Sequence, residues 1–173
     1  MDGDLNATLG ESGACPEIVH NGKTWKVGYP TQKAKAILNN LVVAYASAEI
    51  QTASESLPPA LYQQMLSDFT TKIGQRYYKT WHQGWIEIAM GQDGDILFLL
   101  SLVKLHQPNA TENDARMLFE ECGPMVQTAM AQVMPVFFQI LEADYPSQLP
   151  KENRAQLRAA AENRFRSLLK PTD

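Results

Sequence analysis

The positions of proline and glycine constrain the fold of this 173-residue chain more than any other feature. After residue 30 they separate segments in which apolar residues recur at spacings of three and four. Because that spacing places apolar side chains on one face of an α-helix, each segment predicts an amphipathic helix. The boundaries are Pro30, Pro58 and Pro59, Asp93-Gly94-Asp95, residues 108–111, Gly123-Pro124 and residues 146–150.

One segment before residue 30 has the pattern of a β-hairpin. Asn21 and Gly22 tolerate the positive φ of both central positions in a type I′ turn, and the residues around them alternate between apolar and polar. An isolated hairpin is marginal in water, so its apolar residues must pack on helices or on another chain. We predict a hairpin at residues 17–28, after a polar, glycine-containing leader at residues 1–16 that we expect to be disordered.

The rest of the chain, residues 29–173, predicts one all-α domain, with about six to seven helices in total. Helices are expected at residues 31–54, 56–77, 83–90, 96–105, 112–121, 124–141 and 150–169. The segment 96–105 is apolar on nearly every side and should be the central buried helix. Thr31, Asp93 or Asp95, and Thr111 with Asp114 are the expected N-terminal caps. Pro135 should kink the helix that contains it.

The charge of the chain is unevenly distributed. The net charge of −4 disfavours nucleic-acid binding, which depends on neutralising phosphates. The segment from residue 151 to 173 nevertheless carries +3, because six basic residues (Lys151, Arg154, Arg158, Arg164, Arg166 and Lys170) outnumber Glu152, Glu162 and Asp173. A basic end on an acidic body can fold back on that body or recruit an acidic partner.

Neither a membrane span nor a disulfide framework is expected. The apolar run at 96–105 is about half the length of a membrane span, and no signal peptide is recognisable at the start of the chain. Cys15 and Cys122 are far apart in the sequence and are expected to be reduced. We therefore expect a cytoplasmic protein without a membrane partner.

No group of residues has the spacing of a catalytic or metal site. His20, His82 and His106 are not at ligand spacing on one helix, and the Asp93 segment lacks the acidic twelfth residue of a calcium loop. Cys122 follows two glutamates, which oppose formation of a thiolate. We expect no catalytic residue, no metal and no cofactor.

An aromatic cluster supports an alternative from another class. Tyr77, Tyr78, Trp81 and Trp85 lie close together in the sequence and could stack on a flat ligand, although such clusters more often form the corner of a core. The corresponding hypothesis is a small-molecule-binding regulator or enzyme with its pocket near Trp81 and Trp85.

One ordered set of motifs resembles a known family. The hairpin Asn21-Gly22-Lys23-Thr24-Trp25-Lys26-Val27 leads through Tyr29-Pro30-Thr31 into a long helix; the segment 91–95 precedes the apolar helix, and residues 106–112 open the next one. Over about residues 17–122, this order resembles the small helical tail assembly chaperones of long-tailed bacteriophages and prophages. The resemblance implies a non-enzymatic protein of the host cytoplasm that coats the tape measure protein before the tail tube forms. It also implies that this chain is the shorter of two products, the longer one arising by ribosomal frameshifting.

The two ends of the domain are the expected contact surfaces for a protein partner or for a second copy in a homo-oligomer. The hairpin is expected to expose an edge, and the helix at 150–169 has a narrow apolar stripe flanked by arginines. The partner-binding residues predicted on this basis are Ile18, Trp25, Val27, Arg154, Leu157, Arg158, Phe165 and Arg166. A further alternative is a structural protein of the virion, such as a tail or connector component, whose hairpin extends a neighbouring sheet.

Overall fold

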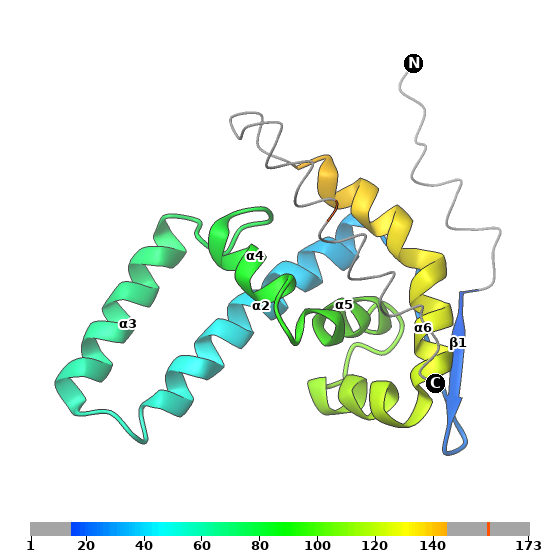
Figure 1. The fold of residues 1–173 in the computed structure, drawn as a ribbon, viewed down its shortest axis with the longest axis horizontal. Coiled ribbons are helices and arrows are strands. Elements are labelled where there is room, and N and C mark those ends of the chain that lie inside the picture. Colours follow the sequence, from blue (N-terminus) through cyan, green and yellow to red (C-terminus); the bar gives the residue numbers. More distant parts are fainter. Residues whose placement is uncertain (1–14, 145–158, 160–173) are drawn as a thin grey trace.

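The structure, a computed structural model, describes residues 15–144 and residue 159. This part of the chain is mostly helical, with one short antiparallel hairpin at its N-terminal end, which confirms the predicted fold class (Figure 1). The elements are β1 (Glu17–His20), β2 (Lys23–Lys26), α2 (Gln32–Ala53), α3 (Pro59–Gly74), α4 (Gln83–Ala89), α5 (Gly94–Val103) and α6 (Glu112–Glu142).

The described residues contain five helices, fewer than the six to seven predicted. The helix expected at 150–169 lies, apart from residue 159, outside the described residues. The two expected at 112–121 and 124–141 are continuous in α6. Their predicted boundary is a kink at Cys122, where φ is −124° and ψ is 24°. Pro124 explains the kink, since its ring lacks a hydrogen-bond donor and clashes with the preceding turn. At Pro135 the backbone dihedrals remain helical.

The apolar helix α5 is at the centre of the core, as predicted. It packs against α2, α4 and α6, and seven consecutive residues, from 97 to 103, are buried. Phe98 meets Phe137 of α6 edge to face, with ring centroids 5.5 Å apart. Within the described residues, no helix combines enough length with enough apolar character to span a lipid bilayer.

Two of the three side-chain caps expected at helix N-termini are present. Thr31 accepts a hydrogen bond from the backbone N–H of Ala34 at 3.2 Å, and Thr111 and Asp114 form the expected capping box. Asp93 occupies the N-cap position of α5 but makes no side-chain capping bond. Its carboxylate is bound instead by Tyr45 and Arg116. Of the two predicted caps, Asp93 and Asp95, Asp93 is thus confirmed in the N-cap position, but without the expected side-chain bond.

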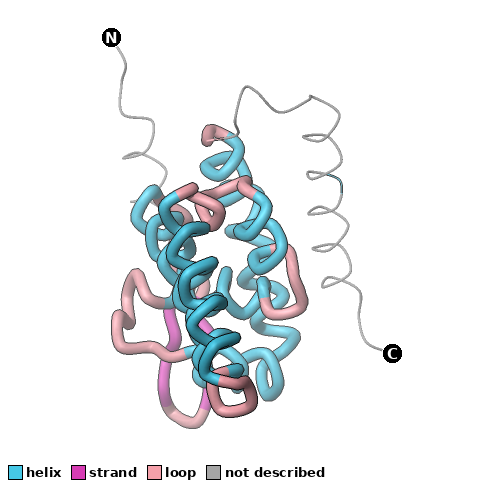
Figure 2. Tube along the Cα trace, turned by 90° about the vertical axis from the view of Figure 1, so that its left-hand side faces the viewer, coloured by secondary structure: helices cyan, strands magenta, loops and turns pink. Residues whose placement is uncertain are grey.

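The hairpin lies against the helical core. Asn21 and Gly22 have φ values of 49° and 74°, as the predicted tight turn requires. Ile18 pairs with Trp25 across the two strands, and both side chains point into the core with that of Val27, at exposed fractions of 0 to 2%. Figure 2 shows the two strands in magenta at one edge of the helical body.

Helix α3 differs from the others because none of its residues is buried. It follows α2 after a turn at residues 54–58 and extends beside the second half of that helix, at the margin of the molecule (Figure 1). The helix ends at Gly74, before Arg76, whose φ of 59° is left-handed. The prediction that this helix extends to Tyr77 is therefore wrong. The space between α2 and α3 is the candidate site.

Candidate functional site

The hairpin residues predicted to bind a partner are part of the core. Ile18, Trp25 and Val27 are buried against the chain's own helices, because an isolated hairpin gains stability by packing its apolar face on a helical body. The expectation that they form an exposed edge is therefore wrong. Val19, on the opposite face, is the hairpin residue with an exposed apolar side chain, at 58%. Arg154, Leu157, Arg158, Phe165 and Arg166 lie outside the described residues.

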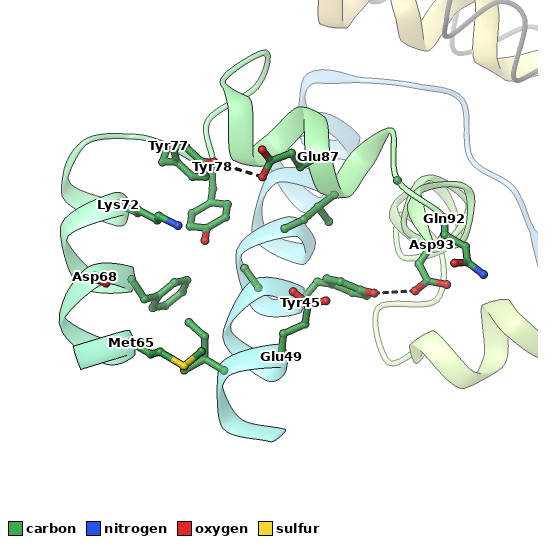
Figure 3. A pocket seen from close by; sticks show the side chains of 15 residues that line it. Tyr45, Glu49, Met65, Asp68, Lys72, Tyr77, Tyr78, Glu87, Gln92 and Asp93 are labelled. Carbon is green, nitrogen blue, oxygen red and sulfur yellow. Dashed lines mark hydrogen bonds between the residues drawn. The ribbon is translucent and has the colours of Figure 1, made fainter. Parts of the chain in front are cut away.

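A groove of about 500 Å³ separates α2 from α3 and is closed at one end by α4 and the loop that follows it (Figure 3). We call it the α2–α3 groove. Its lining residues are Tyr45, Ala46, Glu49 and Ile50 of α2; Met65, Asp68, Phe69 and Lys72 of α3; and Tyr77, Tyr78, Glu87, Ile88, Gly91, Gln92 and Asp93.

Both walls of the groove carry apolar side chains. Ile50 of α2 and Met65 and Phe69 of α3 are among its lining residues. These α3 residues belong to a stripe that also contains Tyr62, Leu66 and Ile73. Such a stripe normally faces a core, yet here Ile73 is 41% exposed. Leu61, beside the stripe, is 51% exposed. The groove thus presents an amphipathic helix whose apolar side has no complete cover within the described residues.

Aromatic side chains close one end of the groove. The ring of Tyr78 lies 5.7 Å from that of Phe69 and 5.2 Å from that of Tyr77, centroid to centroid. The Lys72 ammonium lies 5.0 Å from the centroid of the Tyr77 ring, within the range of a cation–π interaction. Tyr77 also donates a hydrogen bond from its hydroxyl to Glu87 at 3.3 Å, so this end is held by several polar contacts.

A polar network lies where the loop after α4 lines the groove. Tyr45 donates its hydroxyl proton to Asp93 at 2.7 Å, and Arg116 of α6 donates to the second oxygen of Asp93 at 3.1 Å. Arg116 also binds Glu112, one helical turn earlier, at 2.7 Å. The hydrogen bonds that Asp93 accepts from Tyr45 and Arg116 lower its pKa from the ordinary value of 3.8. The same bond to Asp93, together with burial, raises the pKa of Tyr45 to about 12. The network therefore ties α2, α5 and α6 together beside the groove.

The charge around the groove is mainly negative. Glu49, Asp68, Glu87 and Asp93 line it, with Lys72 as the cation among the lining residues. Asp93 is compensated by Arg116. Within the described part of the chain, no ion pair includes Glu49 or Asp68. An occupant with basic side chains would supply the missing charge.

The residues considered for reactive chemistry are dispersed. His20 pairs with Glu121 at 2.8 Å, and His106 contacts the Cys15 thiol at 3.6 Å, a proximity that the sequence did not predict. Cys122 is buried in the kink of α6. Among the described residues, no group of three or more histidine, cysteine or acidic side chains has the arrangement of a metal site.

The aromatic hypothesis placed a pocket near Trp81 and Trp85. Both indoles are buried, at exposed fractions of 3% and 0%, and neither lines the α2–α3 groove. Their rings pack together with centroids 5.4 Å apart, and the Trp81 N–H donates to the backbone oxygen of Leu141. These two residues therefore have a structural role in the core beside the groove, whereas Tyr77 and Tyr78 of the same cluster line it.

The sequence shows only part of the groove. The apolar spacing of α3 and the pair Tyr77 and Tyr78 are visible in it, but the spacing does not show whether the stripe faces a core or a groove. The network of Tyr45, Asp93 and Arg116 joins positions separated by 48 and 23 residues, and no local pattern signals it.

No protein-family model, curated protein or solved structure matches this chain.

Proposed function

We propose that this chain is a non-enzymatic assembly chaperone that holds an amphipathic helix of a partner protein in the α2–α3 groove. The observation that carries the proposal is α3 itself, a 16-residue helix with an apolar stripe and no buried residue. Helices with this pattern usually bury the stripe, because each fully buried large apolar side chain contributes about 1.5–3 kcal/mol. A partner helix laid in the groove would complete that burial.

The chemistry of the groove indicates the kind of helix that fits. An apolar face at spacings of three and four would contact Ile50, Met65 and Phe69. The thioether of Met65 adapts to side chains of different shape, which suits a protein that must bind successive segments of a long partner. Basic residues beside that face would meet Glu49 and Asp68.

The resemblance to tail assembly chaperones supplies a specific partner for this proposal. A tape measure protein is long and apolar-periodic, so it would offer many amphipathic helical segments to such a groove before the tail tube forms around it. On this proposal the chain acts in the host cytoplasm as part of phage tail assembly. If the gene immediately downstream encodes a tape measure protein, its product is the partner to test for binding.

Binding of two designed peptides tests the proposal. Both carry leucines at spacings of three and four, with arginine flanks in one and glutamate flanks in the other. We expect the full chain to bind the arginine peptide more tightly, with an affinity that falls as salt increases. The double variant Glu49→Lys/Asp68→Lys should reverse this preference. Glu120→Lys/Glu121→Lys, which makes the same charge change on α6, should retain it.

Two results would contradict the proposal. If neither peptide nor a co-expressed tape measure protein binds the full chain, α3 is not a recognition surface. If the α6 control loses binding as fully as the groove variant does, the effect comes from net charge and not from the groove.

A further inference from the structure

We infer that, in the absence of a partner, residues 151–169 of the same chain occupy the α2–α3 groove and thereby regulate access to it. The inference rests on the proposed function, because it treats the groove as a helix-binding site. It adds an occupant that is part of the protein and a competition between that occupant and the partner. Three observations support it: reach, charge and apolar spacing.

The end of the described chain is held within reach of the groove. Lys35, near the start of α2, forms an ion pair with Asp144, two residues after α6 ends. Tyr45, the first groove residue of α2, lies ten residues after Lys35, a distance of about 15 Å along a helix. The six residues from 145 to 150 can span up to about 20 Å. The two lengths are comparable, so residue 151 can approach Tyr45 at the margin of the groove.

The charges of the two surfaces are complementary. The segment from residue 151 to 173 carries +3, whereas the groove is lined by four acidic residues and one lysine. Glu49 and Asp68, on opposite walls, have no ion-pair partner within the described residues. Arg154 and Arg158 of the segment would supply cations to them.

The apolar residues of the segment also match the groove. Leu157, Ala161, Phe165 and Leu168 recur at spacings of three and four, which is the pattern the groove requires of an occupant. A 19-residue helix measures about 28 Å and the 16 residues of α3 about 24 Å, so the two lengths are similar. One amphipathic segment would thus cover the apolar stripe of α3 along most of its length.

The occupant is assigned to the same chain and not to a second copy. A segment tethered by a short linker is present at an effective concentration in the millimolar range, which a separate molecule reaches only in concentrated solution. The same tether allows displacement, since a partner helix of higher affinity would release the segment. The groove would then be protected from non-specific association until that partner is present.

Hydrogen exchange measured by mass spectrometry on the full chain tests the inference. The variant Arg154→Glu/Arg158→Glu should accelerate exchange of the α3 amides by about tenfold, equivalent to about 1.4 kcal/mol of lost docking. The control Lys23→Glu/Lys33→Glu makes the same charge change on exposed lysines of the hairpin and of the start of α2, and should leave α3 unchanged. Exchange in α5 should be unaffected in both variants, which shows that each remains folded.

Dilution and peptide binding complete the test. Protection of α3 in the unmodified chain should not change on dilution, and the arginine peptide described above should bind the Arg154→Glu/Arg158→Glu variant more tightly than the unmodified chain. Equal exchange of the α3 amides in the unmodified chain and in the Arg154→Glu/Arg158→Glu variant overturns the inference. Protection of α3 that is lost on dilution also overturns it, because a second copy would then be the occupant of the groove. Equal peptide binding to both overturns the inference alone, while binding to neither overturns the proposed function.

Discussion

The hydroxyl of Tyr45 and the carboxylate of Asp93, 48 residues apart in the sequence, are 2.7 Å apart in the fold. This hydrogen bond joins the middle of α2 to the start of α5 at the edge of the α2–α3 groove. Arg116 extends it to α6. This polar contact, as well as apolar packing, therefore fixes the position of α2, which forms one wall of the α2–α3 groove.

Replacing Asp93 should change how stability depends on pH. Folding lowers the pKa of Asp93 below 3.8, so its ionised form favours the folded state. That contribution is complete above the unfolded pKa and is lost as the pH falls through the folded pKa. We expect Asp93→Asn to lower the free energy of unfolding by about 1–2 kcal/mol at neutral pH, with a difference that narrows below about pH 4.

Urea denaturation at several pH values measures this effect. Asp68→Asn is the matched control, because Asp68 also lines the groove but forms no ion pair within the described residues. It should leave stability nearly unchanged at every pH. A difference between Asp93→Asn and the unmodified chain that stays constant from neutral to acidic pH would contradict the assigned role of the carboxylate.

The two neighbouring indoles should respond differently to the same substitution. Trp81 donates to the backbone oxygen of Leu141, whereas the Trp85 N–H has no partner within the described residues. Both are buried, so each change to phenylalanine loses comparable packing. Trp81→Phe also removes this hydrogen bond, although the Leu141 carbonyl still accepts one from the backbone N–H of Asp144. We therefore expect it to be more destabilising than Trp85→Phe by about 0.5–1.5 kcal/mol. Thermal unfolding of the two variants under the same conditions decides the order.

Two glycines provide a contrasting pair. A Cβ added to Gly94 would lie 2.0 Å from the backbone oxygen of Ala89, whereas one added to Gly74 meets nothing within 4 Å. Gly94→Ala should therefore force the turn between α4 and α5 apart and cost about 1–3 kcal/mol. Gly74→Ala should instead stabilise the last turn of α3 by about 0.5–1 kcal/mol. Chemical denaturation measures the effect of Gly94→Ala, and amide exchange in α3 measures that of Gly74→Ala. Equal losses of stability in the two variants would contradict the prediction.

Phenylalanines on α3 and α5 should have different weights in folding. Phe98 is buried against Phe137, and Phe98→Ala should cost about 3–5 kcal/mol. Phe69 is only partly buried and meets Tyr78 at 5.7 Å, so Phe69→Ala should cost less than about 1.5 kcal/mol. The same Phe69→Ala variant should bind the arginine peptide more weakly. Retained peptide affinity with a large loss of stability would place Phe69 in the core instead.

Local signals in the sequence predicted the elements but not the groove. Proline positions and the caps at Thr31 and Thr111 act within a few residues, so they could be interpreted without a structure. Whether an apolar stripe is covered is decided by other segments. The stripes of α2 and α3 have the same spacing, yet Leu38 and Val42 are buried and no residue of α3 is. Asp93 shows the same limit, because its carboxylate binds Tyr45 and Arg116, which are distant in the sequence, and makes no capping bond to α5.

An α3 without buried residues has a consequence for how this protein can diverge. Substitutions on that helix are constrained by whatever the groove binds and only weakly by the stability of the remaining fold. The core of α2, α5, α6 and the hairpin can therefore stay constant while α3 adapts to a new target. Replacing residues 59–74 with an amphipathic helix that carries different groove residues should change the binding preference and leave the rest of the fold intact.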